Sequence, residues 1–109
     1  MSASNISAVT KSASAAAVSG RSRLMGVYFV NLIAGVSNTQ GSVNIRNGAA
    51  VSDTILFTLN ASTAAAGTSV DIPDGGMVFS GGMYIDIPTL TPTNSITHVT
   101  LLFEGGAAA

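Results

Sequence analysis

Residues 24–36 read LMGVYFVNLIAGV, an uncharged stretch that follows Arg21 and Arg23 closely. A helix that spans a membrane needs about 20 apolar residues, so thirteen are too few. A secretion signal fits poorly as well, because the 23 preceding residues are too long for its charged start and no small-residue cleavage site follows directly. The stretch therefore predicts a buried β-strand.

Alternation along this strand places apolar side chains on both of its faces. The predicted first face carries Met25, Val27 and Phe29, and the predicted second face carries Leu24, Tyr28 and Val30. A two-layer sandwich covers only one face of such a strand. We expect the N-terminal segment or another copy of the chain to cover the second face, which favours self-association.

The composition predicts one domain with an uncharged surface. The chain has 109 residues, a net charge of −1 and no cysteine, and only 8% of its residues are charged, against about 25% in an average soluble domain. So small a net charge does not attract nucleic acid or an anionic membrane. A surface of Ser, Thr, Asn, Gly and Ala can pack against a neighbour without removing many charges from water.

Short runs of period two fill the chain from residue 40 onward. GSVNIRNG (41–48) and DTILFTLN (53–60) alternate apolar and polar residues, and Asn47-Gly48 is a turn pair between them. Further strands are expected at 70–72, 77–79 and 83–87, and the last strand carries Val99, Leu101 and Phe103 on one face.

These short strands predict an all-β fold, an antiparallel β-sandwich or jelly-roll-like domain with about seven or eight strands. The predicted domain covers 21–105, residues 1–20 are an extended arm or edge strand, and 106–109 are a tail. The predicted core consists of Val27, Phe29, Val43, Ile45, Ile55, Phe57, Leu59, Val70, Ile72, Phe79, Ile85, Ile87, Val99, Leu101 and Phe103.

The sequence nominates no catalytic, cofactor-binding or metal-ligating residue. His98 is the single histidine and has no acidic neighbour in the sequence, which is more typical of a surface side chain than of a catalyst. Asp71 and Asp74 flank a turn, but the run lacks the dense oxygen ligands of a calcium loop. We therefore expect no enzymatic activity, no cofactor and no metal.

Arg21 and Arg23 have alternate spacing, which puts both on one face of an extended chain. They are either a docking contact to an acidic partner, an inter-subunit pair with Asp53 or Glu104, or a solvated strand entrance. The candidate partner interface consists of Ile6, Val9, Arg21, Arg23, Leu24, Tyr28 and Val30.

The segments AVSGRSRLMGVYFVN (17–31), GSVNIRNG (41–48), DTILFTL (53–59), DIPDGGMVFSGGMYIDI (71–87) and SITHVTLLFEG (95–105) resemble small virion proteins of tailed bacteriophages. The likeness lies in strand pattern and turns over most of residues 15–104. It implies a structural protein of the virion that decorates or cements a capsid in several copies. It transfers no catalytic residue.

The leading hypothesis is therefore a capsid decoration or cement protein located in the virion. Its expected partners are itself, with a trimer as the favoured homo-oligomer, and the major capsid protein or other virion proteins, with neither nucleic acid nor membrane. The alternative is a tail or fibre component, or a receptor- or carbohydrate-binding tip that uses Tyr28 or Tyr84. A small hydrolase would require carboxylates to converge on His98 in a pocket.

Overall fold

The computed structural model describes residues 6–31, 41–61, 66–73, 75–89, 94 and 96–109, and these residues form eight β-strands and no helix. The strands are β1 (Ser7–Lys11), β2 (Ala15–Asn31), β3 (Gly41–Asn47), β4 (Ile55–Ala61), β5 (Ala66–Asp71), β6 (Met77–Phe79), β7 (Gly82–Asp86) and β8 (Ile96–Ala108). All pairings between them are antiparallel, so the predicted all-β class is confirmed.

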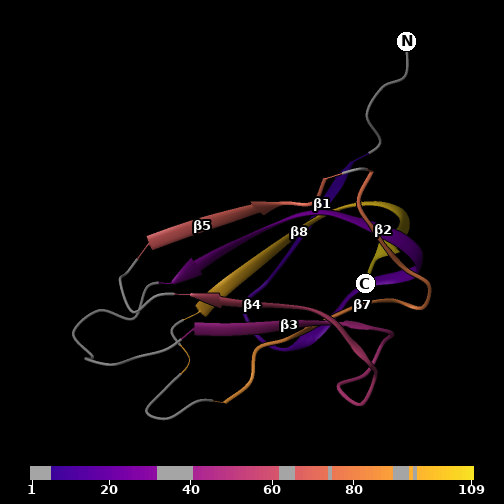
Figure 1. The fold of residues 1–109 in the computed structure, drawn as a ribbon. Helices are drawn as coiled ribbons and strands as arrows, with labels where there is room; N and C mark the ends of the chain where they lie inside the picture. The colour runs from indigo at the N-terminus through magenta and orange to yellow at the C-terminus, as the bar shows by residue number, and fades with distance from the viewer. Residues whose placement is uncertain (1–5, 32–40, 62–65, 74, 90–93, 95) are drawn as a thin grey trace.

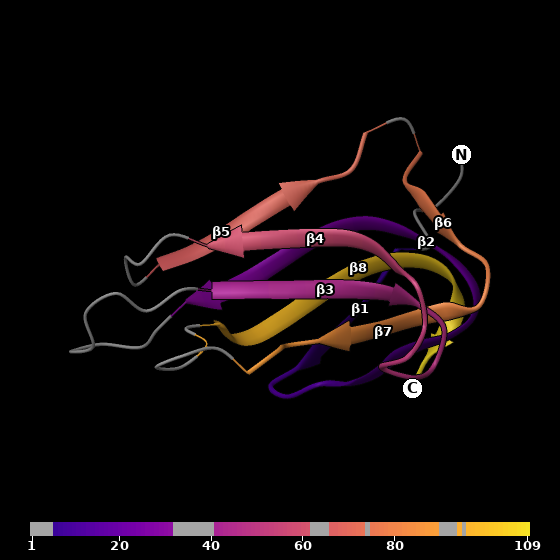
Figure 2. The same ribbon diagram turned by 60° about the horizontal axis from the view of Figure 1, so that its bottom comes forward.

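Hydrogen bonding joins the strands into one sheet with the order β1-β8-β2-β7-β3-β4, and β5 and β6 also pair with β2. The described strands therefore do not divide into the two separate sheets of the predicted sandwich. Figures 1 and 2 show that the sheet instead folds over, so that the β3–β4 pair lies across from β2 and β8.

The long strand β2 makes this fold-over possible, because it changes partner along one edge. Its start, Ala15–Ser19, pairs with β7, the middle pairs with β6 at Ser22–Leu24, and Gly26–Asn31 pairs with β5. Its other edge pairs with β8, with register shifts that mark local irregularities. Such bulges bend a strand and increase its twist. One strand thus belongs to both halves of the sheet.

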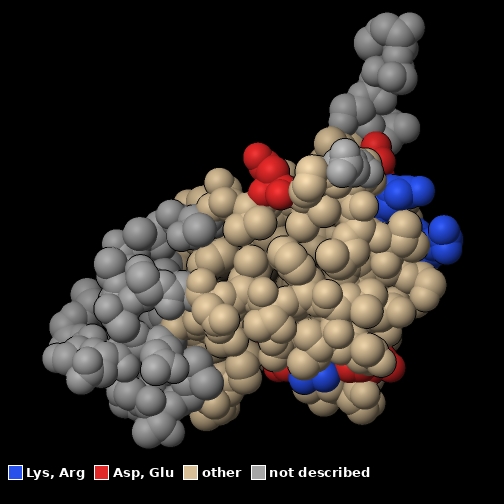
Figure 3. All heavy atoms as spheres, in the orientation of Figure 1, with Lys and Arg blue, Asp and Glu red and all other residues tan. Residues whose placement is uncertain are grey.

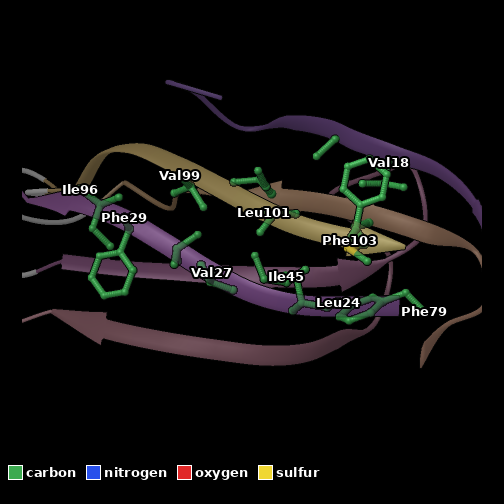
Figure 4. Close-up of a cluster of buried hydrophobic side chains, with 14 residues drawn as sticks. Val18, Leu24, Val27, Phe29, Ile45, Phe79, Ile96, Val99, Leu101 and Phe103 are labelled. Atoms are coloured by element: carbon green, nitrogen blue, oxygen red, sulfur yellow. The ribbon is translucent and has the colours of Figure 1, made fainter. Parts of the chain in front are cut away.

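The core lies between these two halves. Figure 4 shows the side chains in a row that extends from Phe29 and Ile96 at one end to Phe79 and Phe103 at the other. Predicted core residues that are buried are Val27, Phe29, Val43, Ile45, Phe79, Ile85, Val99, Leu101 and Phe103. Those that are half-buried against them are Phe57, Leu59, Val70, Ile72 and Ile87.

Two apolar side chains face the opposite way from the prediction, and a register shift accounts for each. Leu24 was placed on the second face, but it is fully buried, because the β2–β8 register shifts between Leu24 and Gly26. Ile55 was placed in the core, but 42% of it is exposed, because the β3–β4 register shifts and Ile55 pairs with Arg46. An extra residue in one strand inverts the alternation beyond it.

The N-terminal and C-terminal segments are part of the sheet. Ser7–Lys11 forms the edge strand β1, one of the two forms expected for residues 1–20. Residues 15–20 instead begin β2, in which Ala17 and Val18 are buried. The expected tail at 106–109 mostly continues β8, and the N–H of Ala109 donates to the carbonyl of Ala17 at 2.9 Å.

Candidate interaction surface

One side of the sheet formed by β1, β8 and the second part of β2 faces solvent, and we call it the outer face. Register defines it: Ala8 pairs with Leu102, Thr10 with Thr100, and Tyr28 with Thr100 on the other edge of β8. The alternate positions, such as Val27, Phe29 and Leu101, are buried in the core. The outer face consists of Ile6, Ala8, Thr10, Tyr28, Val30, His98, Thr100 and Leu102.

Three large apolar side chains on the outer face are open to solvent. The exposed fractions are 45% for Ile6, 44% for Tyr28 and 37% for Leu102. A methyl group built on Gly26 would lie 3.5 Å from Cδ1 of Leu102, so the Leu102 side chain leans over Gly26 toward β2. Tyr28 is two residues further along β2, within reach of a diagonal contact. Ile6 directly precedes β1 and lies on the same face, two residues before Ala8, the partner of Leu102. We call these three residues the apolar area.

Hydroxyl groups and a few charges surround this area. The Oγ1 atoms of Thr10 and Thr100 lie 2.7 Å apart and link β1 to β8. Arg23 lies opposite Glu104 in the β2–β8 register, at the end of the outer face. The predicted contact of Arg23 with Glu104 between subunits stays a prediction, and within one chain the two residues are cross-strand neighbours.

The candidate interface residues fall into three groups in the structure. Tyr28 and Val30 lie on the outer face opposite Thr100 and His98, and Ile6 directly precedes β1 toward the other end of that face. Arg21 and Arg23 are exposed on the middle part of β2, and Nη1 of Arg23 reaches the carbonyl of Gly75 at 3.5 Å. Val9 and Leu24 form the third group, because they face inward. Val9 packs half-buried against the core and Leu24 is fully buried, so neither offers a side chain to a partner.

The sequence placed Leu102 with His98 and Thr100 on the outward face of the last strand but did not include it in the candidate interface. It also missed a polar network between β3, β7 and the segment before β4. Nη2 and Nε of Arg46 donate to Oδ2 of Asp86 at 2.8 and 3.1 Å, and Nδ2 of Asn44 donates to the same oxygen at 3.3 Å. Nη1 of Arg46 donates to the carbonyl of Asp53. Alternation placed Arg46 and Asp86 away from the core, but only the β3–β7 register shows that they meet.

Potential metal ligands are not clustered among the described residues. No group of three or more His, Cys, Asp or Glu side chains in that part of the chain is placed to hold a metal ion. His98 is exposed on β8, and its Nδ1 lies 3.1 Å from Oγ1 of Thr97. Asp74, the second residue of the suggested calcium turn, lies outside the described residues.

The described ranges contain no helix long and apolar enough to cross a membrane. A search of the chain against protein-family models, curated proteins and solved structures found no match.

Proposed function

We propose that the protein is a non-enzymatic structural protein of a virion that attaches to another virion protein, such as the major capsid protein, through its outer face. Attachment through this face is supported by the apolar area of Ile6, Tyr28 and Leu102 on an uncharged sheet face. Apolar residues with hydroxyl neighbours can be buried without leaving a charge unpaired. The assignment to a virion rests on the resemblance of the strand and turn pattern to small phage virion proteins.

The surface of the molecule supports binding by shape rather than by charge. Figure 3 shows a broad area without charged side chains, with charged groups at its upper and lower margins. Charged residues make up only 8% of the chain. An interface formed by such a surface should be apolar at its centre and should depend little on ionic strength.

The first test is whether the protein is part of a particle. Virus particles purified on a density gradient, from a culture that expresses the gene, should contain peptides of this chain in the particle band by mass spectrometry. A chain found only in the soluble fraction, away from intact particles, would contradict the virion assignment.

The second test concerns the outer face. Particles stripped of the protein should rebind the wild-type chain, and Leu102→Lys should weaken rebinding, because a lysine there must lose water on contact. Val51→Lys is a matched control, since Val51 is an exposed residue of the β3–β4 turn. Equal rebinding by both variants would show that another surface makes the attachment.

A carbohydrate-binding tip module is the second candidate. The exposed ring of Tyr28 supports it, because Thr100 and Ser69 flank it in register and carry hydroxyl groups. A glycan array probed with the wild-type chain and with Tyr28→Ser tests this alternative. A glycan that binds only the wild type would favour the tip module, and an array without any bound glycan would argue against it.

A further inference from the structure

We propose that two copies of the chain associate through their β4 strands, which pair antiparallel about a two-fold axis and continue the sheet across both copies. β4 (Ile55–Ala61) ends the strand order and pairs with β3 alone. The main-chain N–H and C=O groups on its second edge have no strand partner in the described part of the chain. Such an edge is a template for another strand.

The sequence of β4 contains neither a charge nor a proline to discourage edge pairing, and the irregularity in its pairing with β3 is confined to its start, at Ile55 and Leu56. The strand reads ILFTLNA, without a charge or a proline. Proteins commonly protect edge strands with lysine, with proline or by shortening them. β1, at the other end of the strand order, is shorter and carries Lys11, whose Nζ donates to the carbonyl of Ala109. The two ends of the sheet therefore differ in what protects them.

The core is also incompletely covered beside β4. Phe57 and Leu59 on β4 and Val70 and Ile72 at β5 are only half-buried, although all four pack against the core. At the start of β4, 42% of Ile55 and 41% of Leu56 are exposed. Val51, in the preceding turn, is also exposed. A strand added to this edge would bury apolar surface together with main-chain groups, which stabilises association.

Charge favours a second copy as the occupant. A second copy presents the same uncharged open edge, so the pairing of two β4 strands satisfies both edges at once. The nearest carboxylate before the strand, Asp53, accepts a hydrogen bond from the N–H of Ala50 at 2.9 Å. Antiparallel pairing of β4 with itself therefore opposes no like charges within the strand, and it gives a closed, isologous contact.

The β4 dimer goes beyond the proposed attachment through the outer face, and it is a two-fold assembly where the sequence favoured a trimer. Its test needs no virus particle. A chain that dimerises but is absent from particles would contradict the proposed function alone, and a chain found in particles that is monomeric in solution would contradict the dimer alone.

The experiment is sedimentation equilibrium of the full chain and of two variants. Leu56→Lys places a charge on the β4 edge, and Leu102→Lys places one on the outer face at a residue of similar exposure. We expect the wild type and Leu102→Lys to dimerise and Leu56→Lys to dissociate about tenfold more readily or more. A monomeric or trimeric wild type, or an unchanged Leu56→Lys dimer, would overturn the proposal.

Hydrogen exchange of the wild type supplies a readout that does not depend on a variant's folding. Amides of residues 55–61 should exchange more slowly when the protein concentration is raised through the dissociation constant, while amides of β1 should not change. Protection that is independent of concentration in β4, or that rises in β1 instead, would contradict pairing through β4.

Discussion

The direction of each side chain on a strand depends on the pairing register, and irregularities in two strand pairs reverse it in this fold. Val43 and Ile45 are buried as expected, because the β3 pattern is unbroken. Leu24 and Ile55 lie on the opposite side from the prediction, because each is next to a register shift. An extra residue in a strand carries no signal that identifies it in a single sequence. The reversal of side-chain direction beyond it can therefore be read only from the pairing register.

Leu101 and Leu102 offer a direct test of this assignment, because they are adjacent and face opposite ways. Leu101 is fully buried, whereas 37% of Leu102 is exposed. Leu101→Ala should lower the free energy of unfolding by about 2–5 kcal/mol, since it leaves a cavity. Leu102→Ala should lower it by less than about 1 kcal/mol. Urea denaturation measures both, and equal losses would show that the assignment of the two faces of β8 is wrong.

The Arg46–Asp86 pair makes a second prediction for single residues. The Asp86 side chain is 9% exposed, and removal of it leaves the guanidinium of Arg46 with little solvent and without its partner. Asp86→Ala should therefore destabilise the fold by about 3–5 kcal/mol. Asp71→Ala, at an exposed aspartate that ends β5, is the control and should change stability by about 0.5 kcal/mol or less. Thermal unfolding of both variants decides whether the pair is needed.

Among the elements, β6 and most of β8 were the most predictable and β2 the least. β6 and β8 follow from alternation and from the turn residues beside them. β2 begins in a Ser/Ala-rich segment that has little apolar pattern, and three successive partners along one edge hold it in place. The pairing of β1 with β8 joins segments about 90 residues apart, which local patterns do not specify.

Deletions test the division between β1 and β2. A chain without residues 1–12 loses only the edge strand and should remain folded with reduced stability. A chain without residues 1–20 also loses Ala17, Val18 and the pairing with β7, and it should fail to fold. Circular dichroism with thermal unfolding distinguishes the two cases. A cooperative transition in the longer deletion would show that the start of β2 is dispensable.

The β6–β7 turn depends on a glycine that approaches β2 closely. Gly82 has a φ of 97°, and a Cβ there would lie 2.4 Å from the carbonyl oxygen of Val18. Gly75 has a φ of 81° with no atom within 4 Å of such a Cβ. Gly75→Ala should lower the stability by about 1–2 kcal/mol through its backbone conformation alone. Gly82→Ala should lower it by about 2–5 kcal/mol, because the contact adds to that cost.

At the scale of the whole molecule, the sequence predicted the all-β class and a surface with few charges, but it did not predict one sheet folded over on itself. The sequence indicated that the strand from residue 24 has two apolar faces, and Tyr28 on this part of β2 is exposed in the structure. The open edge lies at β4 because β4 is last in the strand order. The same runs of apolar and polar residues are compatible with several β topologies that have other strand orders. Both candidate contacts therefore required the register and the order of the strands.

Native mass spectrometry of the full chain, over a series of protein concentrations, shows whether this protein associates through uncharged surfaces. We expect a species of twice the 10.8 kDa chain mass that dissociates on dilution and persists at high salt, because few charges take part. A mass that stays at 10.8 kDa at every concentration, or a dimer that salt disperses, would contradict the account.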